Sequence, residues 1–222
     1  MHYLTLARHV GRTMPWSTLC AGCLAGTVFL AVMAHVADVS HTPLGPGDVR
    51  IAFLPAIAAL AFIPRTPFRP VAQATPVPAW VAPAGRVLLA APILALTCWA
   101  QLTIAAHAVP VLLTAHSHPP LGHSPAVYPV IAQLTGWCAV TVAVAACVDR
   151  SRYADVAGAV AVPVSFAAIA LAWYAPLTSR LVAQPPATPH GATVAWCAVT
   201  AIFTALTCAA MRDRWHRYTR VR

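Results

Sequence analysis

Apolar runs alternate with short polar connections along the whole chain. The six runs are residues 16–36, 51–63, 87–106, 127–148, 154–174 and 192–211. A helix needs about 20 apolar residues to cross the hydrocarbon layer of a bilayer, and every run except the second reaches that length. The pattern predicts an all-α membrane protein with six transmembrane helices in one domain, residues 1–222.

The second run has only 13 residues, between Arg50 and Pro64, and two interpretations of it compete. It crosses the membrane as a short helix whose Arg50 extends to the headgroups, or it enters and leaves on the same side. A crossing is favoured, because without it Arg65 and Arg69 would lie outside and every later loop would change sides. Pro55 is expected to kink this helix.

The first 14 residues have an amphipathic pattern of their own. Apolar side chains recur at helical spacing, and polar or basic side chains take the other side. The apolar positions are Tyr3, Leu6, Ala7 and Val10, and the polar ones are Thr5, Arg8, His9 and Arg12. We expect a short interfacial helix on the cytoplasmic leaflet, ended near Gly11 and Pro15.

Composition and charge fix the class of protein and its orientation. Hydrophobic residues make up 59% of the chain and charged residues 9%, against about 25% charged in ordinary soluble domains. The net charge of +9 comes from arginines in short loops and in the tail at residues 212–222, which suits anionic lipid headgroups better than nucleic acid. With the amino terminus inside, twelve arginines are cytoplasmic and two are outside. We therefore expect a multi-pass plasma-membrane protein with both termini in the cytoplasm.

Seven cysteines lie almost entirely inside the apolar runs, where they are expected to pack as small hydrophobic residues. Cys20 and Cys23 also form a C-x-x-C pair, which leaves a redox role as an alternative. The histidines gather on the predicted outer side, and no structured metal site is expected from their spacing. Two other uses stay open: metal binding by His116, His118 and His123 in a proline-rich loop, and haem ligation by His35 and His107.

The polar side chains inside the predicted spans include Gln101, Gln133 and Thr135. Polar groups are expensive in lipid and tend to face the interior of a bundle, so these residues are candidates to line a transport path. The alternative is that they only hold helices together. The chain has no Walker A, H-E-x-x-H or G-x-G-x-x-G motif, so it is not expected to be an enzyme.

The connection over residues 64–86 carries three arginines, six prolines and Trp80 between two apolar runs. Its basic character predicts a cytoplasmic position, and Trp80 is expected at the boundary between water and lipid. A surface of this kind is accessible to a soluble partner.

The same connection resembles that of the ABC-2 type transporter permeases, in which an ATPV run and a basic or aromatic patch precede a G-R or G-K pair at the start of the third span. The matching residues here are Gln73-Ala74-Thr75-Pro76-Val77-Pro78-Ala79-Trp80 and Gly85-Arg86-Val87-Leu88-Leu89-Ala90. The resemblance implies the membrane subunit of an ATP-driven exporter, paired with a second permease subunit, identical or related. It implies that ATP binds and is hydrolysed on a separate ATPase subunit, with no cofactor on this chain. The residues expected to couple to that ATPase are Gln73, Ala74, Thr75, Pro76, Val77 and Trp80.

A second function from another class remains open. The chain would then be a membrane anchor or assembly subunit with no transport path, which handles metal or haem through its outer histidines. A co-purified ATPase, or absorbance from a bound cofactor, separates the two.

Overall fold

A computed structural model describes residues 10–40, 44, 46–64, 81–107, 127–149, 157–174 and 189–219. Most of these residues are helical, the exceptions being residues 13–15, 44 and 61–64, and none of the described residues lies in a strand. After a helical turn at residues 10–12 come α2 (Trp16–Ser40), α3 (Pro46–Leu60), α5 (Val81–His107), α6 (Val127–Asp149), α7 (Ala157–Tyr174) and α9 (Pro189–Thr219). The expected all-helical class is confirmed for the described part of the chain.

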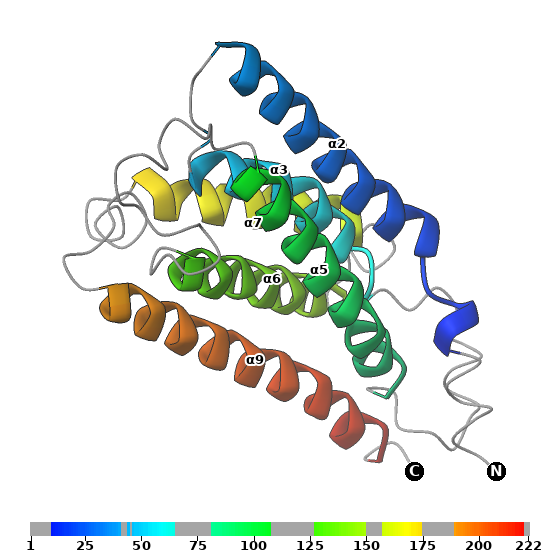
Figure 1. The fold of residues 1–222 in the computed structure, drawn as a ribbon. Coiled ribbons are helices and arrows are strands. Elements are labelled where there is room, and N and C mark those ends of the chain that lie inside the picture. Colours follow the sequence, from blue (N-terminus) through cyan, green and yellow to red (C-terminus); the bar gives the residue numbers. More distant parts are fainter. Residues whose placement is uncertain are drawn as a thin grey trace.

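Successive helices run in alternating directions (Figure 1). One end of the bundle holds the starts of α2 and α5 and the ends of α3 and α6, and we call it the Arg86 end. The opposite end holds the end of α5 and the start of α6, and we call it the His107 end. This arrangement puts side chains that are far apart in the sequence at the same level of the bundle.

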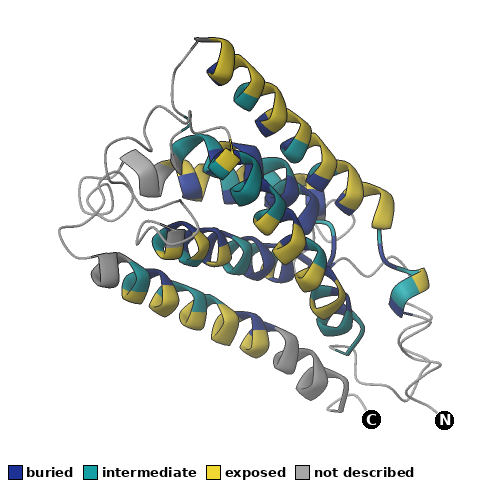
Figure 2. Cartoon of the chain, viewed as in Figure 1, coloured by how far each residue is buried: buried dark blue, intermediate teal, exposed yellow. Residues whose placement is uncertain are grey.

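Helices α3 and α6 form the centre of the bundle. Helix α3 packs against α2, α5 and α6, whereas α6 packs against α3, α7 and α9. The central helix α6 is also more buried than the outer helices (Figure 2). Of the residues in its apolar segment 56% are buried, against 17–22% in α2, α5 and α9. In α3, Ala52, Phe53, Ala56 and Ile57 are all buried.

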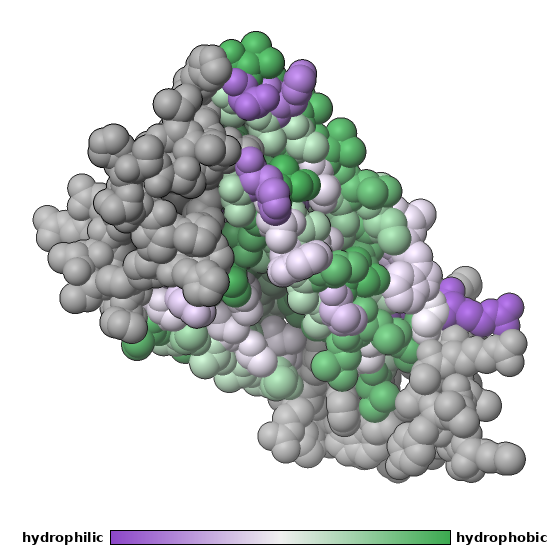
Figure 3. Space-filling view, viewed as in Figure 1, coloured by the Kyte–Doolittle hydropathy of each residue, from purple (hydrophilic) through white to green (hydrophobic). Residues whose placement is uncertain are grey.

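The outer surface of the bundle is apolar. Large hydrophobic side chains are exposed along α2, α5 and α9, among them Leu24, Leu88, Trp99 and Val194. In the view of Figure 3, hydrophobic atoms cover most of the described surface of α2 and α5, and hydrophilic ones gather near the helix ends. A contiguous apolar surface of this extent is rare on a soluble monomer. The chain is a helical membrane protein.

Four helices are long and apolar enough to cross a bilayer: Trp16–Val39, Val81–His107, Tyr128–Asp149 and Thr193–Ala210. The second and fifth expected spans correspond to shorter elements. Helix α3 has 15 residues, a length of about 22 Å, and the apolar part of α7 is Gly158–Ala170. The described residues therefore contain four candidate spans where the hydrophobic pattern predicts six.

Several boundaries differ from those expected. Helix α3 begins at Pro46, ahead of the run predicted at 51–63, and after Leu60 the chain leaves the α-helix in a tight turn over residues 61–64. Helix α5 begins at Val81, although the span was expected to begin at residue 87. Helix α9 continues to Thr219, so most of the basic tail expected at 212–222 extends the last helix.

Close helix packing depends on glycines of α2. A Cβ on Gly22 would lie 2.5 Å from the carbonyl oxygen of Pro55, and a Cβ on Gly26 would overlap the carbonyl oxygen of Ala52. Gly22 and Gly26 form a G-x-x-x-G motif, which lets two membrane helices approach until their backbones touch. The spacing of this motif is visible in the sequence and could have predicted the close contact of α2 with α3.

Candidate functional site

The residues expected to couple to an ATPase, Gln73 to Val77 and Trp80, lie outside the described residues. The next described residue is Val81, the first residue of α5. The last six residues of the predicted connection, 81–86, are therefore helical and belong to α5.

Arg86 was expected in a loop, but it lies in the second turn of α5 with only 3% of its surface exposed. Its Nη2 donates a hydrogen bond to Thr13 Oγ1 at 3.0 Å. The negative charge of Asp149, the last residue of α6, acts on the same guanidinium, and Asp149 is also 3% exposed. The hydrogen bond to Thr13 and the negative charge of Asp149 both favour the charged guanidinium against the cost of its burial. Arg86, Asp149 and Thr13 are called the Arg86 cluster below.

The turn at residues 10–12 packs on the start of α5. A Cβ on Gly85 would lie 3.2 Å from Val10 Cγ1, and Val10 is buried. The turn is also held from the α2 side, since Trp16 Nε1 donates to the carbonyl oxygen of Gly11 at 2.6 Å. Of the eight residues in the amphipathic pattern, only Val10 and Arg12 are described, and the other six lie outside the described residues. Val10 is buried and Arg12 is exposed. Val10 contacts the protein, whereas the sequence pattern suggested a lipid surface.

Gln101 on α5 lies fully inside the bundle, with 0% of its surface exposed. Its Nε2 donates to the carbonyl oxygen of Ala52 on α3 at 3.3 Å, beside Gly26 of α2. Its Oε1 has no hydrogen-bond partner among the described residues. Gln101 thus joins three helices and retains one free acceptor, which water or a solute can satisfy.

Gln133 and Thr135 lie on α6 but have different surroundings. Gln133 is 1% exposed, and its Nε2 has no hydrogen-bond partner within the described part of the chain. Thr135 is exposed, and its Oγ1 donates to the carbonyl oxygen of Ile131 at 2.8 Å. Of the three candidate path residues, Gln101 and Gln133 face the interior and Thr135 faces outward.

Further buried polar groups escaped the sequence analysis. Ser165 on α7 is buried with no partner for its Oγ among the described residues. Thr97 and Thr141 are buried too, and each hydroxyl donates to a carbonyl oxygen of its own helix, that of Ile93 at 2.8 Å and that of Trp137 at 2.9 Å. Serine and threonine satisfy themselves in this way inside a helix and leave no distinctive signal in the sequence.

The described part of the interior therefore offers neutral hydrogen-bonding groups along its length. Its buried charges, Arg86 and Asp149, both lie at the Arg86 end.

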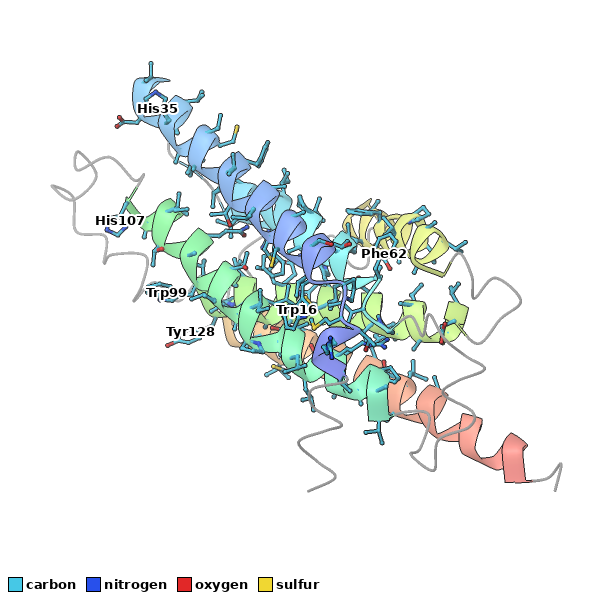
Figure 4. All side chains as sticks on the ribbon, turned by 90° about the vertical axis from the view of Figure 1, so that its right-hand side faces the viewer. Trp16, His35, Phe62, Trp99, His107 and Tyr128 are labelled. Atoms are coloured by element: carbon cyan, nitrogen blue, oxygen red, sulfur yellow. The ribbon has the colours of Figure 1, made fainter. Side chains whose placement is uncertain are left out.

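The residues of the histidine and cysteine alternatives fall only partly among the described residues. His35 and His107 are exposed and lie at the His107 end, on the neighbouring helices α2 and α5 (Figure 4). No group of three or more metal-ligating side chains occurs among the residues searched, which exclude His116, His118 and His123. Cys20 is exposed and Cys23 is buried, and both thiols are free.

A scan against protein-family models and searches of curated proteins and of solved structures gave no match. The functional assignment therefore depends on the chemistry and geometry of the chain itself.

Proposed function

We propose that this protein is the permease subunit of an ATP-driven exporter of the ABC-2 type. One observation carries the proposal: α5 begins directly after the predicted coupling connection, and its buried Arg86 ties that start to the turn at 10–12 and to α6. A permease driven by a separate ATPase needs such a mechanical path from a cytoplasmic surface into its helices.

In the proposed permease, all six helices cross the membrane. Helices α3 and α7 are short, yet each runs antiparallel to the helix before it, as successive crossings require (Figure 1). The central position of α3 keeps its short ends among protein groups, which relieves the mismatch with the bilayer. Exposed aromatic side chains support membrane anchoring, because Trp16 and Tyr128 begin α2 and α6 at opposite ends of the bundle.

The orientation follows from the arginines. The Arg86 end is cytoplasmic in this proposal, and the chain lies in the plasma membrane with both termini in the cytoplasm. ATP binds to the partner ATPase, whose closure displaces the connection at residues 65–80. The start of α5 moves with it, and the change alters access to the interior at Gln101 and Gln133. A second permease subunit completes the path.

Trp80 is the residue through which we test the coupling. A buried aromatic anchor at a protein interface typically contributes about 2 kcal/mol or more. Trp80→Ala is therefore expected to weaken ATPase binding about thirty-fold and to uncouple hydrolysis from transport, with membrane insertion intact. Trp99→Ala is the matched control, because Trp99 is 64% exposed on the outer surface of α5.

The measurement is affinity and stimulated hydrolysis in vesicles that contain the purified permease and ATPase. An equal loss of ATPase binding and of stimulated hydrolysis in both variants would mean that tryptophan removal merely destabilises the bundle. Unchanged binding and stimulation in Trp80→Ala would make Trp80 a lipid anchor and would remove the coupling role of this connection.

A membrane anchor or assembly subunit for metal or haem is the second candidate. The observation that favours it is the exposure of His35 and His107 at the same end of neighbouring helices. This candidate predicts visible absorbance from the purified protein that is lost in His35→Ala and His107→Ala. A colourless, metal-free protein with a bound ATPase would exclude it.

A further inference from the structure

The turn at residues 10–12 is fastened to the bundle by a small number of specific contacts. Thr13 Oγ1 donates to the carbonyl oxygen of Val10 at 3.2 Å and accepts from Arg86 Nη2 at 3.0 Å. The Thr13 hydroxyl therefore does two things: it closes the turn, and it binds the turn to α5. Val10 adds an apolar contact against Gly85, one residue before Arg86.

Arg86 on α5 is also under the electrostatic influence of Asp149, the last residue of α6. Helix α5 packs mainly on α2 and α3, whereas α6 packs mainly on α9, α7 and α3. Little direct packing therefore holds α5 to α6, and the attraction between Arg86 and Asp149 acts across the pair. A movement of α5 away from α6 at the Arg86 end would have to overcome this attraction and rearrange the packing of α5 on α2 or α3.

From these contacts we propose that the turn at 10–12 is a latch. Arg86 holds this turn against α5 through Thr13. Release of the turn frees the start of α5 to move relative to α6. In the docked turn, Thr13 accepts a hydrogen bond from the guanidinium, and the negative charge of Asp149 attracts the same group. Arg86 and Thr13 are thus positioning residues for the movement of α5. The purpose of the latch rests on the proposed function, but its existence is testable in the isolated chain.

The first test concerns docking. A Cβ on Gly85 would lie 3.9 Å from Val10 Cβ, which is within the range of about 3.5–4.5 Å found in disulfides. In a full-length variant with the native cysteines replaced, Val10→Cys with Gly85→Cys should oxidise to an intramolecular disulfide. Loss of both thiols from reaction with a polyethylene glycol maleimide reports the bond. Failure of this pair to form the disulfide would overturn the latch.

The second test concerns what holds the turn. Val10→Cys alone is buried in the docked turn, so its maleimide labelling rate measures the undocked fraction. A hydrogen bond to a charged group contributes at least about 1.5 kcal/mol, so its loss should raise the rate about ten-fold. Thr13→Val is the test variant and Thr18→Val, at an exposed position of α2, is its control. Arg86→Gln, paired with exposed Arg12→Gln, repeats the comparison. Should Arg86→Gln fail to fold, the threonine pair decides alone.

The third test concerns movement. Spin labels at Leu88→Cys on α5 and at Cys147 on α6 use two exposed positions near the Arg86 end. With the other cysteines replaced, Thr13→Val should add a second distance population by double electron–electron resonance, and Thr18→Val should not.

An unchanged distribution, or equal labelling in the two threonine variants, would overturn the proposal. No ATPase is present in these assays. A chain that binds no ATPase can still pass them, so failure of the latch and failure of the proposed function are distinguishable.

Discussion

Substitution of Gly26 by alanine tests the packing of α2 on α3 most sharply. The added Cβ would overlap the carbonyl oxygen of Ala52 and lie 3.1 Å from Gln101 Nε2. The carbonyl belongs to the backbone of a buried helix and cannot turn away, so α2 and α3 must separate. Separation also stretches the hydrogen bond from Gln101 to Ala52.

We expect Gly26→Ala to lower the free energy of unfolding by about 1–3 kcal/mol, the usual cost of overpacking a core by a methyl group. Gly47→Ala is the matched control. Gly47 lies in the first turn of α3, and a Cβ there meets nothing within 4 Å. Because alanine is the better helix former, this control should stabilise by about 0.5–1 kcal/mol. The same substitution is thus expected to lower the free energy of unfolding at Gly26 and to raise it at Gly47.

The assay is thermal stability of the detergent-solubilised protein, followed by the monodisperse peak in size-exclusion chromatography. Gly26→Ala should lose the peak at a lower temperature than the wild type, and Gly47→Ala at the same or a higher temperature. Equal stability of Gly26→Ala and the wild type would refute the close approach of α2 and α3.

Three other predictions follow from the structure and the charge pattern. Reporter fusions at Ser117 should lie outside and those at Ser151 inside, and the reverse result would invert the proposed orientation. Gln133→Leu removes a buried amide whose donor has no hydrogen-bond partner among the described residues. This variant should keep or raise thermal stability while it impairs function. A large loss of stability would assign Gln133 to helix packing instead. Arg8→Asp with Arg12→Asp should impair insertion, because each arginine contributes about 1 kcal/mol near anionic headgroups, and normal amounts in the correct orientation would contradict that.

Much of the fold could be predicted from the chain alone. The six apolar runs each correspond to a helix, because apolar length is a local property that the sequence displays directly. The start of α5 was misplaced because Arg86 looks like a loop residue. Its burial depends on Asp149 and Thr13, which the folded bundle brings to it. Pairing of this kind is not visible in a linear pattern.

The central position of α3 was equally hidden. A short apolar run looks the same whether lipid or protein surrounds it, and only the glycines of α2 signal a close neighbour. For the candidate site, Gln101 and Gln133 could be found as polar residues in apolar runs, but their unmet hydrogen-bonding atoms follow from the packing. The exposure of Thr135 likewise depends on which side of α6 meets α3, α7 and α9.

As the proposed permease subunit, this chain would convert ATP hydrolysis on another subunit into movement of its own helices. The most direct measurement combines the spin-label pair at Leu88→Cys and Cys147 with the reconstituted ATPase, with and without ATP and vanadate. The account predicts that vanadate-trapped nucleotide changes the distance between α5 and α6 at the Arg86 end, and that Trp80→Ala abolishes the change although the fold is intact. A distance that is the same in every nucleotide state, in a complex that hydrolyses ATP, would contradict it.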